Sequence, residues 1–248
     1  MGVFYFKEFA VEHDSSTMKV GTDGVLLGAA VESHNAGNIL DAGTGCGVIA
    51  LMLAQRFQAE ITAIDIDKDS IKEAASNFER SPWSVRLYPV HETMQEHSQK
   101  WSDCYDMIVS NPPFFQNSLK TPGEGRNKAR HNDTLSYRNM ASSAYRLLNT
   151  TGELWIILPV TESNAFLSIA EELNLFLGYE LLIQPKPGHN PNRRIMKLCR
   201  GKKATRYNSE SITIRTEDNE FTEEYKKLTT THTQDLRRTA HLNREAKQ

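Results

Sequence analysis

A glycine-rich loop is the first feature of the sequence that could bind a ligand. Within "LDAGTGCGVIALMLA", the residues Gly43, Gly45 and Gly47 form the pattern G-x-G-x-G. Glycine lets the backbone adopt unusual dihedral angles and approach a ligand closely. Val48 breaks the dinucleotide-binding pattern G-x-G-x-x-G, and no Gly-Lys-Ser/Thr follows as in a phosphate-binding P-loop. Taken alone, the loop indicates either another kind of nucleotide site or a tight turn.

Two acidic residues could act together with this loop, one just before it and one near the end of the next predicted strand. Asp65 lies near the end of the predicted strand "EITAIDI", 22 residues after Gly43, where a carboxylate can accept hydrogen bonds from two ribose hydroxyls. Asp65 could instead cap the helix that follows, although Asp67 is better placed to do so. Asp41 lies just before the loop and could organise it, or contact the ligand through water.

The stretch "YDMIVSNPPFF" ends a predicted strand with an amide, two prolines and two aromatic rings. The Asn111 side chain accepts and donates hydrogen bonds, and Pro112 and Pro113 stiffen the chain so that the Pro112 carbonyl can face a bound group. The Asn111 side-chain carbonyl and the Pro112 carbonyl could accept both hydrogens of an exocyclic amine and turn its lone pair toward a methyl donor. Phe114 could stack on a base. Such catalysis would be mostly orientation and electrostatic support. The alternative is a strand that stops at prolines, with a phenylalanine in the core.

Strand-like and helix-like segments alternate through the middle of the chain and predict how these residues are positioned. We expect strands at 38–42, 60–66, 84–90, 104–110 and 152–159, and helices at 48–57, 67–78, 134–148 and 162–173. Nearly continuous apolar strands that alternate with helices are typical of a parallel sheet covered on both faces. The pattern therefore predicts a doubly wound α/β fold, in which ligands bind at the carboxyl ends of the strands.

The two ends of the chain depart from this alternation. Segments 178–184 and 193–199 are separated by a connection too short for a crossover helix, so this strand pair should be antiparallel, and 211–216 could add a short edge strand. Before the sheet we expect a hairpin strand and a helix opened by an Asp/Thr cap. We expect one domain, 1–248, with an N-terminal extension at 1–37, the sheet at 38–216 and a C-terminal helix and polar tail at 217–248.

The glycine loop and Asp65 together resemble the cofactor half of the class I S-adenosylmethionine-dependent methyltransferases, and "SNPPFF" resembles motif IV of the amino methyltransferases. The resemblance implies a mostly parallel, seven-stranded Rossmann-like sheet that binds S-adenosylmethionine over residues 43–47, with the ribose on Asp65. It also implies that Glu92, after the third strand, lies near the adenine. Enzymes that act on adenine, guanine and glutamine amides share motif IV, so it implies the reaction and not the substrate.

A narrower resemblance concerns the substrate. The segments "FKEFAVEHDSSTMKVGTDGVLLGA", "SPW", "SNPPFF", the Ala129–Arg130 pair and "FTEEYKKL" resemble the bacterial adenine-N(6) methyltransferases that modify valine-accepting tRNA, over about residues 4–230. This implies an adenosine beside the anticodon as the target, with Lys19, Thr22 and Asp23 close to the cofactor or the entering base. Some members of that family have Tyr where this chain has Phe114, which keeps the stacking face.

Two basic stretches are candidate RNA-binding surfaces in a chain whose net charge is -2. Residues 186–206 contain eight Lys or Arg and no acidic residue, and a second basic stretch, 125–131, follows the N-P-P-F loop. We expect both to border the site and to contact tRNA phosphates around an unstacked adenosine. The residues expected to do so are Arg126, Arg130, His131, Arg193 and Arg194. A solvated rim is the alternative interpretation.

Other sequence features exclude several classes of protein. There is no run of about 18 apolar residues that would predict a membrane span, and the acidic, aromatic start is unlike a signal peptide. Three distant cysteines argue against a disulfide framework or a zinc ribbon. We therefore expect a cytoplasmic protein without a metal, and we take a monomer as the working expectation.

Three other functions stay open at this point. One is a ribosomal RNA guanine amino-methyltransferase. Another is a protein glutamine-amide methyltransferase, although the 37 residues before the sheet leave no room for the separate helical domain usual in those enzymes. The last is an RNA-binding module without catalysis, against which the intact motif at 111–114 argues.

Overall fold

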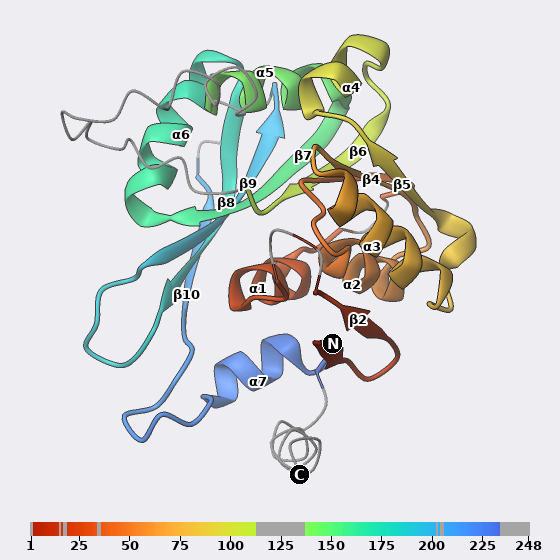
Figure 1. Cartoon of the computed structure of the whole chain (residues 1–248). Helices are drawn as coiled ribbons and strands as arrows, with labels where there is room; N and C mark the ends of the chain where they lie inside the picture. The colour runs from red at the N-terminus through yellow and green to blue at the C-terminus, as the bar shows by residue number, and fades with distance from the viewer. Residues whose placement is uncertain are drawn as a thin grey trace, which may run out of the picture.

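The computed structural model describes residues 2–14, 16, 19–33, 36–112, 137–201, 203 and 206–233. Its main sheet has eight strands in the order β10-β8-β9-β7-β6-β3-β4-β5 (Figure 1). In chain order these strands are β3 (Asn38–Ala42), β4 (Glu60–Asp65), β5 (Leu87–His91), β6 (Tyr105–Ser110), β7 (Leu148–Pro159), β8 (Leu175–Gln184), β9 (Arg193–Arg200) and β10 (Asn208–Thr213). β9 is antiparallel to both of its neighbours, and the other neighbouring pairs are parallel.

The predicted mostly parallel sheet and its antiparallel β8–β9 pair are confirmed, but the expected number of strands is wrong. β10 adds an eighth strand, parallel to β8. An edge strand has unpaired backbone groups that a further strand can satisfy, and the weak pattern at 211–216 understated how far this pairing extends. The strand expected at 84–90 begins later, because residues Ser84–Arg86 form a 3₁₀ turn before β5.

Helices cover both faces of the sheet, as a doubly wound fold requires (Figure 1). The helices α1 (Thr22–Ala30), α2 (Val48–Arg56) and α3 (Lys68–Glu79) pack on one face, and α4 (Met94–Lys100), α5 (Tyr137–Leu147) and α6 (Val160–Glu172) pack on the other. Successive residues of a strand point to opposite faces. Accordingly Ile39 belongs to the first of two cores and Leu40 to the second, and both side chains are fully buried.

The starts of two helices differ in how they are capped. Asp67 precedes α3, and its carboxylate accepts hydrogen bonds from the N–H groups of Asp69 and Ser70, which confirms Asp67 as the cap. The expected Asp/Thr cap of α1 is wrong. Gly21 is the N-cap residue and makes no side-chain capping bond, while Thr22 and Asp23 already lie in the first turn. The Asp23 carboxylate pairs instead with Arg193.

The N-terminal segment forms a small hairpin beside the main sheet. β1 (Val3–Tyr5) and β2 (Ala10–Glu12) pair antiparallel, and the Lys7 N–H donates to the His232 carbonyl just beyond α7 (Glu223–Thr229). The N-terminal hairpin and α7 therefore lie near each other below α1 and α2 (Figure 1). Among the residues that the structure describes, no helix combines the length and apolar character that crossing a bilayer would need.

Gly47 gives the first prediction, because two separate effects oppose a side chain there. Its φ is +85°, and an added Cβ would lie 2.5 Å from Phe78 Cε1 of α3. We expect Gly47→Ala to lower the free energy of unfolding by about 2–4 kcal/mol, from backbone strain and overpacking together. The measurement is urea denaturation followed by circular dichroism.

Gly188→Ala is the matched control. Gly188 also has a positive φ, +71°, but an added Cβ would have no heavy atom within 4 Å. The free energy of unfolding of this variant should fall only by the cost of backbone strain, about 1 kcal/mol. Equal losses in the two variants would contradict the packing of α3 on Gly47.

Candidate active site

The carboxyl ends of β3, β4 and β6 meet at one edge of the sheet. β3 pairs with β4 on one side and with β6 on the other, and Ala42 lies opposite both Ile64 and Ser110. The Ser110 hydroxyl donates to the Ala42 carbonyl over 2.7 Å and ties two of the strand ends together. From here the strand order continues through β4 to β5 in one direction and through β6 to β7 in the other. Open α/β sheets bind ligands at such a switch point.

The glycine loop leaves β3 in a conformation that favours glycine. The φ angles of Gly43, Gly45 and Gly47 are +78°, +56° and +85°. The N–H groups of Gly43 and Thr44 both donate to the Ile64 carbonyl, over 2.9 and 3.0 Å, so the loop is fixed to β4. A Cβ added at Gly43 would have no heavy atom within 4 Å. The backbone at Gly43 is thus open to a ligand, whereas Gly47 packs against α3.

Asp65 lies where the sequence predicted, beside the loop at the end of β4. One carboxylate oxygen accepts from the Gly45 N–H and the other from the Asp67 N–H, each over 2.9 Å. A carboxylate can accept about four hydrogen bonds, so a partly exposed Asp65 that holds the loop keeps further capacity for hydroxyl groups. The two backbone bonds fix the orientation in which that capacity is presented.

Asp41 is the most deeply buried acid of the site, with 0% exposure. Its Oδ2 accepts from the Thr44 hydroxyl over 2.7 Å and from the Ala50 N–H over 3.1 Å, so it joins β3, the loop and α2. Its Oδ1 is buried and has no hydrogen-bond partner among the described residues. Burial raises the pKa of this carboxyl to about 7. Of the two roles considered for Asp41, organisation of the loop is what these bonds accomplish.

Asn111 follows β6 at the same edge and is brought against α1. A Cβ added at Gly24 would lie 3.9 Å from Asn111 Nδ2 and 3.5 Å from Val48 Cγ1. The first turn of α1 therefore packs over the junction between the glycine loop and Asn111. Pro112 is also described, while Pro113 and Phe114 lie outside the described residues.

The three N-terminal residues expected near the cofactor or the entering base, Lys19, Thr22 and Asp23, have different surroundings. Thr22 and Asp23 lie in the same turn of α1 as Gly24, which places them near Asn111. The Asp23 carboxylate accepts from Arg193 Nε over 2.8 Å. Lys19 is exposed and precedes this helix by three residues.

Glu92 is held by protein groups rather than left open to a ligand. It is 9% exposed, and its two carboxylate oxygens bind His97 Nδ1 and Lys100 Nζ of α4. His97 Nε2 in turn contacts the Tyr105 hydroxyl over 2.7 Å. Burial alone would raise the pKa of Glu92, but the hydrogen bonds from Lys100 and His97 outweigh it and the pKa is lowered. In this arrangement Glu92 holds α4 at the end of β5, and His97 links α4 to Tyr105 of β6.

Ile66 lies at the same edge of the sheet and was not among the residues predicted from the sequence. It follows Asp65 directly and is 51% exposed, which is unusual for an isoleucine next to a buried strand. Its carbonyl is bound by His91 Nε2 over 2.9 Å, so the position is fixed. The signal was present in "IDID", where an apolar residue stands between two acids at a strand end. An exposed apolar side chain there offers a surface on which a flat ring can pack.

Tertiary contacts neutralise much of the basic stretch at 186–206. Four of its cations pair with acids from other elements, namely Arg193 with Asp23, Arg194 with Glu180, Lys197 with Glu153 and Arg200 with Asp103. Arg194 is 8% exposed and also donates to the Asn164 side chain. The structure therefore does not present Arg194 to a phosphate, contrary to what its sequence context suggested.

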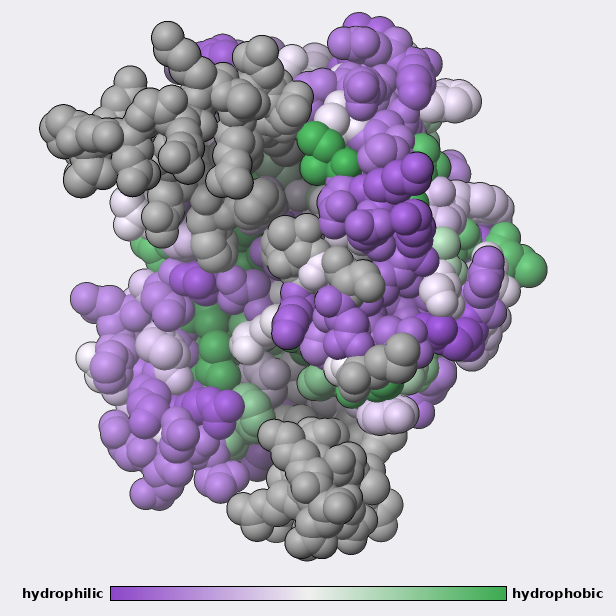
Figure 2. Space-filling model, viewed as in Figure 1, coloured by the Kyte–Doolittle hydropathy of each residue, from purple (hydrophilic) through white to green (hydrophobic). Residues whose placement is uncertain are grey.

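Strand direction divides the cations of this stretch between the two edges of the sheet. β8 runs in the direction of β6, and β9 runs against it, so Lys186 after β8 and Arg193 at the start of β9 lie at the edge that holds the site. Lys203 and Arg206, between β9 and β10, lie toward the opposite edge. In Figure 2 the surface around β8 and β10 is mostly hydrophilic. Arg126, Arg130 and His131 lie outside the described residues.

Comparison with known proteins gives consistent matches. A family model described as methyltransferase small domain matches residues 16–180. The tRNA1(Val) (adenine(37)-N6)-methyltransferase of Bacteroides fragilis is 41% identical over 227 residues, which cover 91% of this chain and 95% of that protein. The protein of the same name from Phocaeicola vulgatus is 46% identical over 194 residues, or 78% of this chain and 82% of that one.

The fold also matches solved structures. The predicted O-methyltransferase Atu636 from Agrobacterium tumefaciens superposes with a TM-score of 0.68 at 16% identity, over 85% of this chain and 96% of that chain. At this identity the match concerns the fold alone.

Burial of Asp41 makes the stability of the protein depend on pH. Its pKa is raised from 3.8 to about 7, so the folded state binds this proton more tightly than the unfolded state does. The free energy of unfolding therefore falls as the pH rises from about 4 to about 7. Between about pH 5 and about pH 7.5 we expect this fall to be smaller in Asp41→Asn by about 2 kcal/mol.

Urea denaturation of both proteins across this pH range is the measurement. Groups other than Asp41 titrate in both proteins, so their contributions cancel in the comparison. Parallel pH profiles would show that Asp41 does not retain its proton in the folded state.

Proposed function

The chain belongs to the methyltransferase small domain family, and from this premise we propose that it transfers a methyl group from S-adenosylmethionine to the N6 amine of an adenine in tRNA. The observation that carries the proposal is the placement of Asn111 against the first turn of α1, beside the glycine loop. The relatives described above are named for adenine 37 of tRNA1(Val). We propose the corresponding adenosine beside the anticodon as the target, and the cytoplasm, where tRNA is found, as the compartment.

The residues at the switch point fit S-adenosylmethionine. The open backbone at Gly43 and the partly exposed Asp65 suit a nucleoside, and the buried, unpartnered Oδ1 of Asp41 suits a positively charged or hydrogen-bond-donating group. Ile66 offers an apolar surface for the adenine. When bound, S-adenosylmethionine supplies an electrophilic methyl group on a sulfonium centre.

Asn111 and Pro112 would act on the acceptor amine. The Asn111 side-chain carbonyl and the Pro112 carbonyl can each accept one hydrogen of an exocyclic amine, which directs the nitrogen lone pair away from them. Orientation of this kind lowers the entropic part of the barrier, and the same carbonyls support the positive charge that develops on the nitrogen. Within this proposal Phe114 stacks on the adenine, and the amine needs no general base before it is methylated.

Glu92 enters the proposal in a changed role. Because Glu92 is only 9% exposed and both of its oxygens already bind α4, we propose that it shapes the adenine end of the site through the position of α4.

Replacing Asn111 and Asp65 one at a time should separate cofactor binding from methyl transfer. We expect Asn111→Ala to lower turnover by about 100-fold or more, as for removal of one catalytic hydrogen-bonding group, with little change in affinity for S-adenosylmethionine. We expect Asp65→Ala to weaken that affinity by at least tenfold, since it removes the ribose acceptor and a loop anchor. Calorimetry gives the affinity.

Turnover is measured with labelled S-adenosylmethionine and total tRNA, followed by digestion to nucleosides. Label in N6-methyladenosine is the expected product. Label in methylguanosine, or in protein but not RNA, would replace the proposed substrate by one of the alternatives. Near-native turnover of Asn111→Ala would overturn the orientation mechanism.

The RNA surface proposed here is the site edge, where Lys186 and Arg193 lie. Each phosphate contact to unpaired RNA contributes about -0.7 to the slope of log affinity against log salt. The double variant Lys186→Ala/Arg193→Ala should therefore flatten this slope by about 0.7 if Arg193 stays paired with Asp23, and by about 1.4 if it exchanges that partner for a phosphate. The measurement is tRNA binding at several salt concentrations.

Lys203→Ala/Arg206→Ala is the matched control, because it removes the same charge from the opposite edge. Its slope should stay close to that of the unaltered protein. Equal flattening in both double variants would indicate a general electrostatic field rather than contact at the site edge. No flattening in either would move the proposed surface to residues 125–131.

A further inference from the structure

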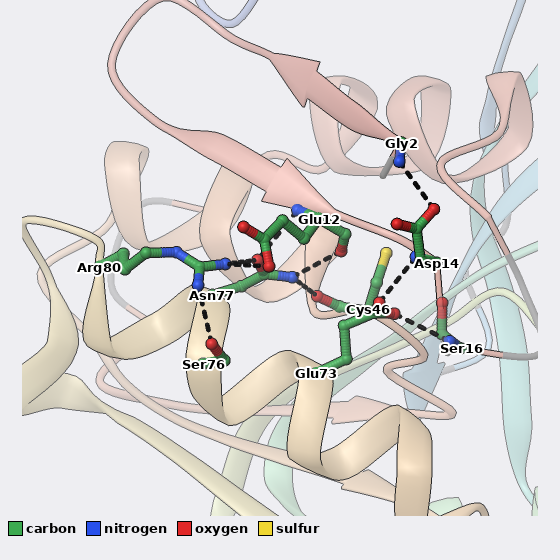
Figure 3. A network of polar contacts seen from close by, with 9 residues as sticks. All are labelled: Gly2, Glu12, Asp14, Ser16, Cys46, Glu73, Ser76, Asn77 and Arg80. Carbon is green, nitrogen blue, oxygen red and sulfur yellow. Dashed lines mark hydrogen bonds and ion pairs between the residues drawn. The ribbon is translucent and has the colours of Figure 1, made fainter.

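Helix α3 presents a stripe of three polar side chains to the N-terminal segment. Glu73, Asn77 and Arg80 are spaced i, i+4 and i+7, which places them on one face of a helix. All three contact residues between Glu12 and Ser16 (Figure 3). The apolar residues Ala74 and Phe78 of the same helix pack against Gly47. Apolar packing therefore already holds α3 against the loop, so the three polar side chains are not needed for that and can have a separate role.

Asn77 joins the N-terminal segment to the glycine loop. Its side chain is 0% exposed. Its amide nitrogen donates to the Glu12 carbonyl over 2.9 Å and to the Cys46 carbonyl over 2.8 Å. Its carbonyl oxygen accepts from the Glu12 N–H over 3.0 Å and from Arg80 over 2.8 Å. All four hydrogen-bonding positions of the amide are thus in use, and one of them ends on the loop itself.

Glu73 holds the same segment one helical turn nearer to the site. Its two oxygens accept from the N–H groups of Asp14, over 2.7 Å, and Ser16, over 2.9 Å. Hydrogen bonds to a carboxylate are about twice as strong as neutral ones. Since the N-terminus of α3 follows the carboxyl end of β4, the chain from Glu12 to Ser16 runs along α3 toward Asp65.

The segment has its second anchor on the far side of the glycine loop. At Gly24 the chain packs against Asn111, which follows β6. One anchor is thus on the helix that follows β4 and the other is at the end of β6, with β3 and its loop between them. In the sequence, Lys19 and Thr22 fall between these two anchors.

We infer that Glu73 and Asn77 are positioning residues for methyl transfer. They hold the described residues 12–14 and 16 against α3, and Asn77 also restrains the cofactor loop through the Cys46 carbonyl. This inference rests on the proposed function, because it takes the glycine loop as the S-adenosylmethionine site. In this role neither residue binds the ligand directly. Their effect passes through the backbone at 12–16 and at 46.

The test compares Glu73→Ala and Asn77→Ala with Glu79→Ala, an exposed acid on the same helix. In both positioning variants we expect about a tenfold rise in the dissociation constant and KM for S-adenosylmethionine, as for the loss of one well-formed hydrogen bond. We expect kcat at saturating cofactor to stay within about twofold, since Asn111 is untouched. Amide exchange at 12–16 should become faster in both, and Glu79→Ala should change none of these quantities.

A merely structural role predicts a different pattern. Faster exchange at 12–16 with unchanged cofactor affinity would overturn the inference, and so would unchanged exchange at 12–16. If Asn77→Ala does not fold, Glu73→Ala still decides the question, because Glu73 is only partly buried. Glu73→Gln keeps a carbonyl acceptor and should recover part of the lost affinity.

Failure of the proposed function would be seen separately. Cofactor affinity and amide exchange are measured without RNA, so they remain informative if no RNA is methylated. A protein that binds S-adenosylmethionine over the loop but methylates no tRNA would overturn the substrate and leave the positioning role standing. A protein that does not bind it at all would overturn both.

Discussion

Two aspartates hold a glycine loop that has little conformational preference of its own, and the rest of the site depends on that constraint. Glycine loses more backbone entropy on folding than any other residue, so three positive φ angles in five residues need external support. Asp41 supplies it from β3 through Thr44 and Ala50. Asp65 supplies it from β4 through the Gly45 N–H. A ligand then meets a backbone that is already in place, which reduces the entropic cost of binding.

The fixed loop in turn allows helices to approach closely on its outer side. Gly47 lets Phe78 of α3 come within a distance that a Cβ would forbid, and Gly28 does the same for Met52 where α1 crosses α2. Small residues at both contacts bring the N-terminal part of the chain over the strand ends. The extension before the sheet is therefore integrated into the site instead of standing as a separate unit, because its polar contacts are made to α3 and its apolar contacts to the shared core.

Much of the fold and of the central site could be predicted from the sequence because the signals are local. Apolar strands alternating with helices predicted the parallel sheet, and the glycine spacing with Asp65 predicted the ligand edge. Asp67 was recognised as a helix cap because capping involves residues only two or three positions apart. Family membership, which residues 16–180 establish, follows from the same motifs. The eighth strand was understated, since pairing at a sheet edge depends on a partner far away in the chain.

The sequence by itself determined the period of each element, the backbone freedom of the loop and the chemistry at the strand ends, because these depend on neighbouring residues. Only the tertiary structure decided which charges remain available. Asp23 and Arg193 are 170 positions apart and form an ion pair. Arg194 is buried, where it pairs with Glu180 and donates to the Asn164 side chain. A charge placed out of water needs a partner, and folding chooses that partner by distance in space. A basic run in the sequence therefore overstates the basic surface that the folded protein presents.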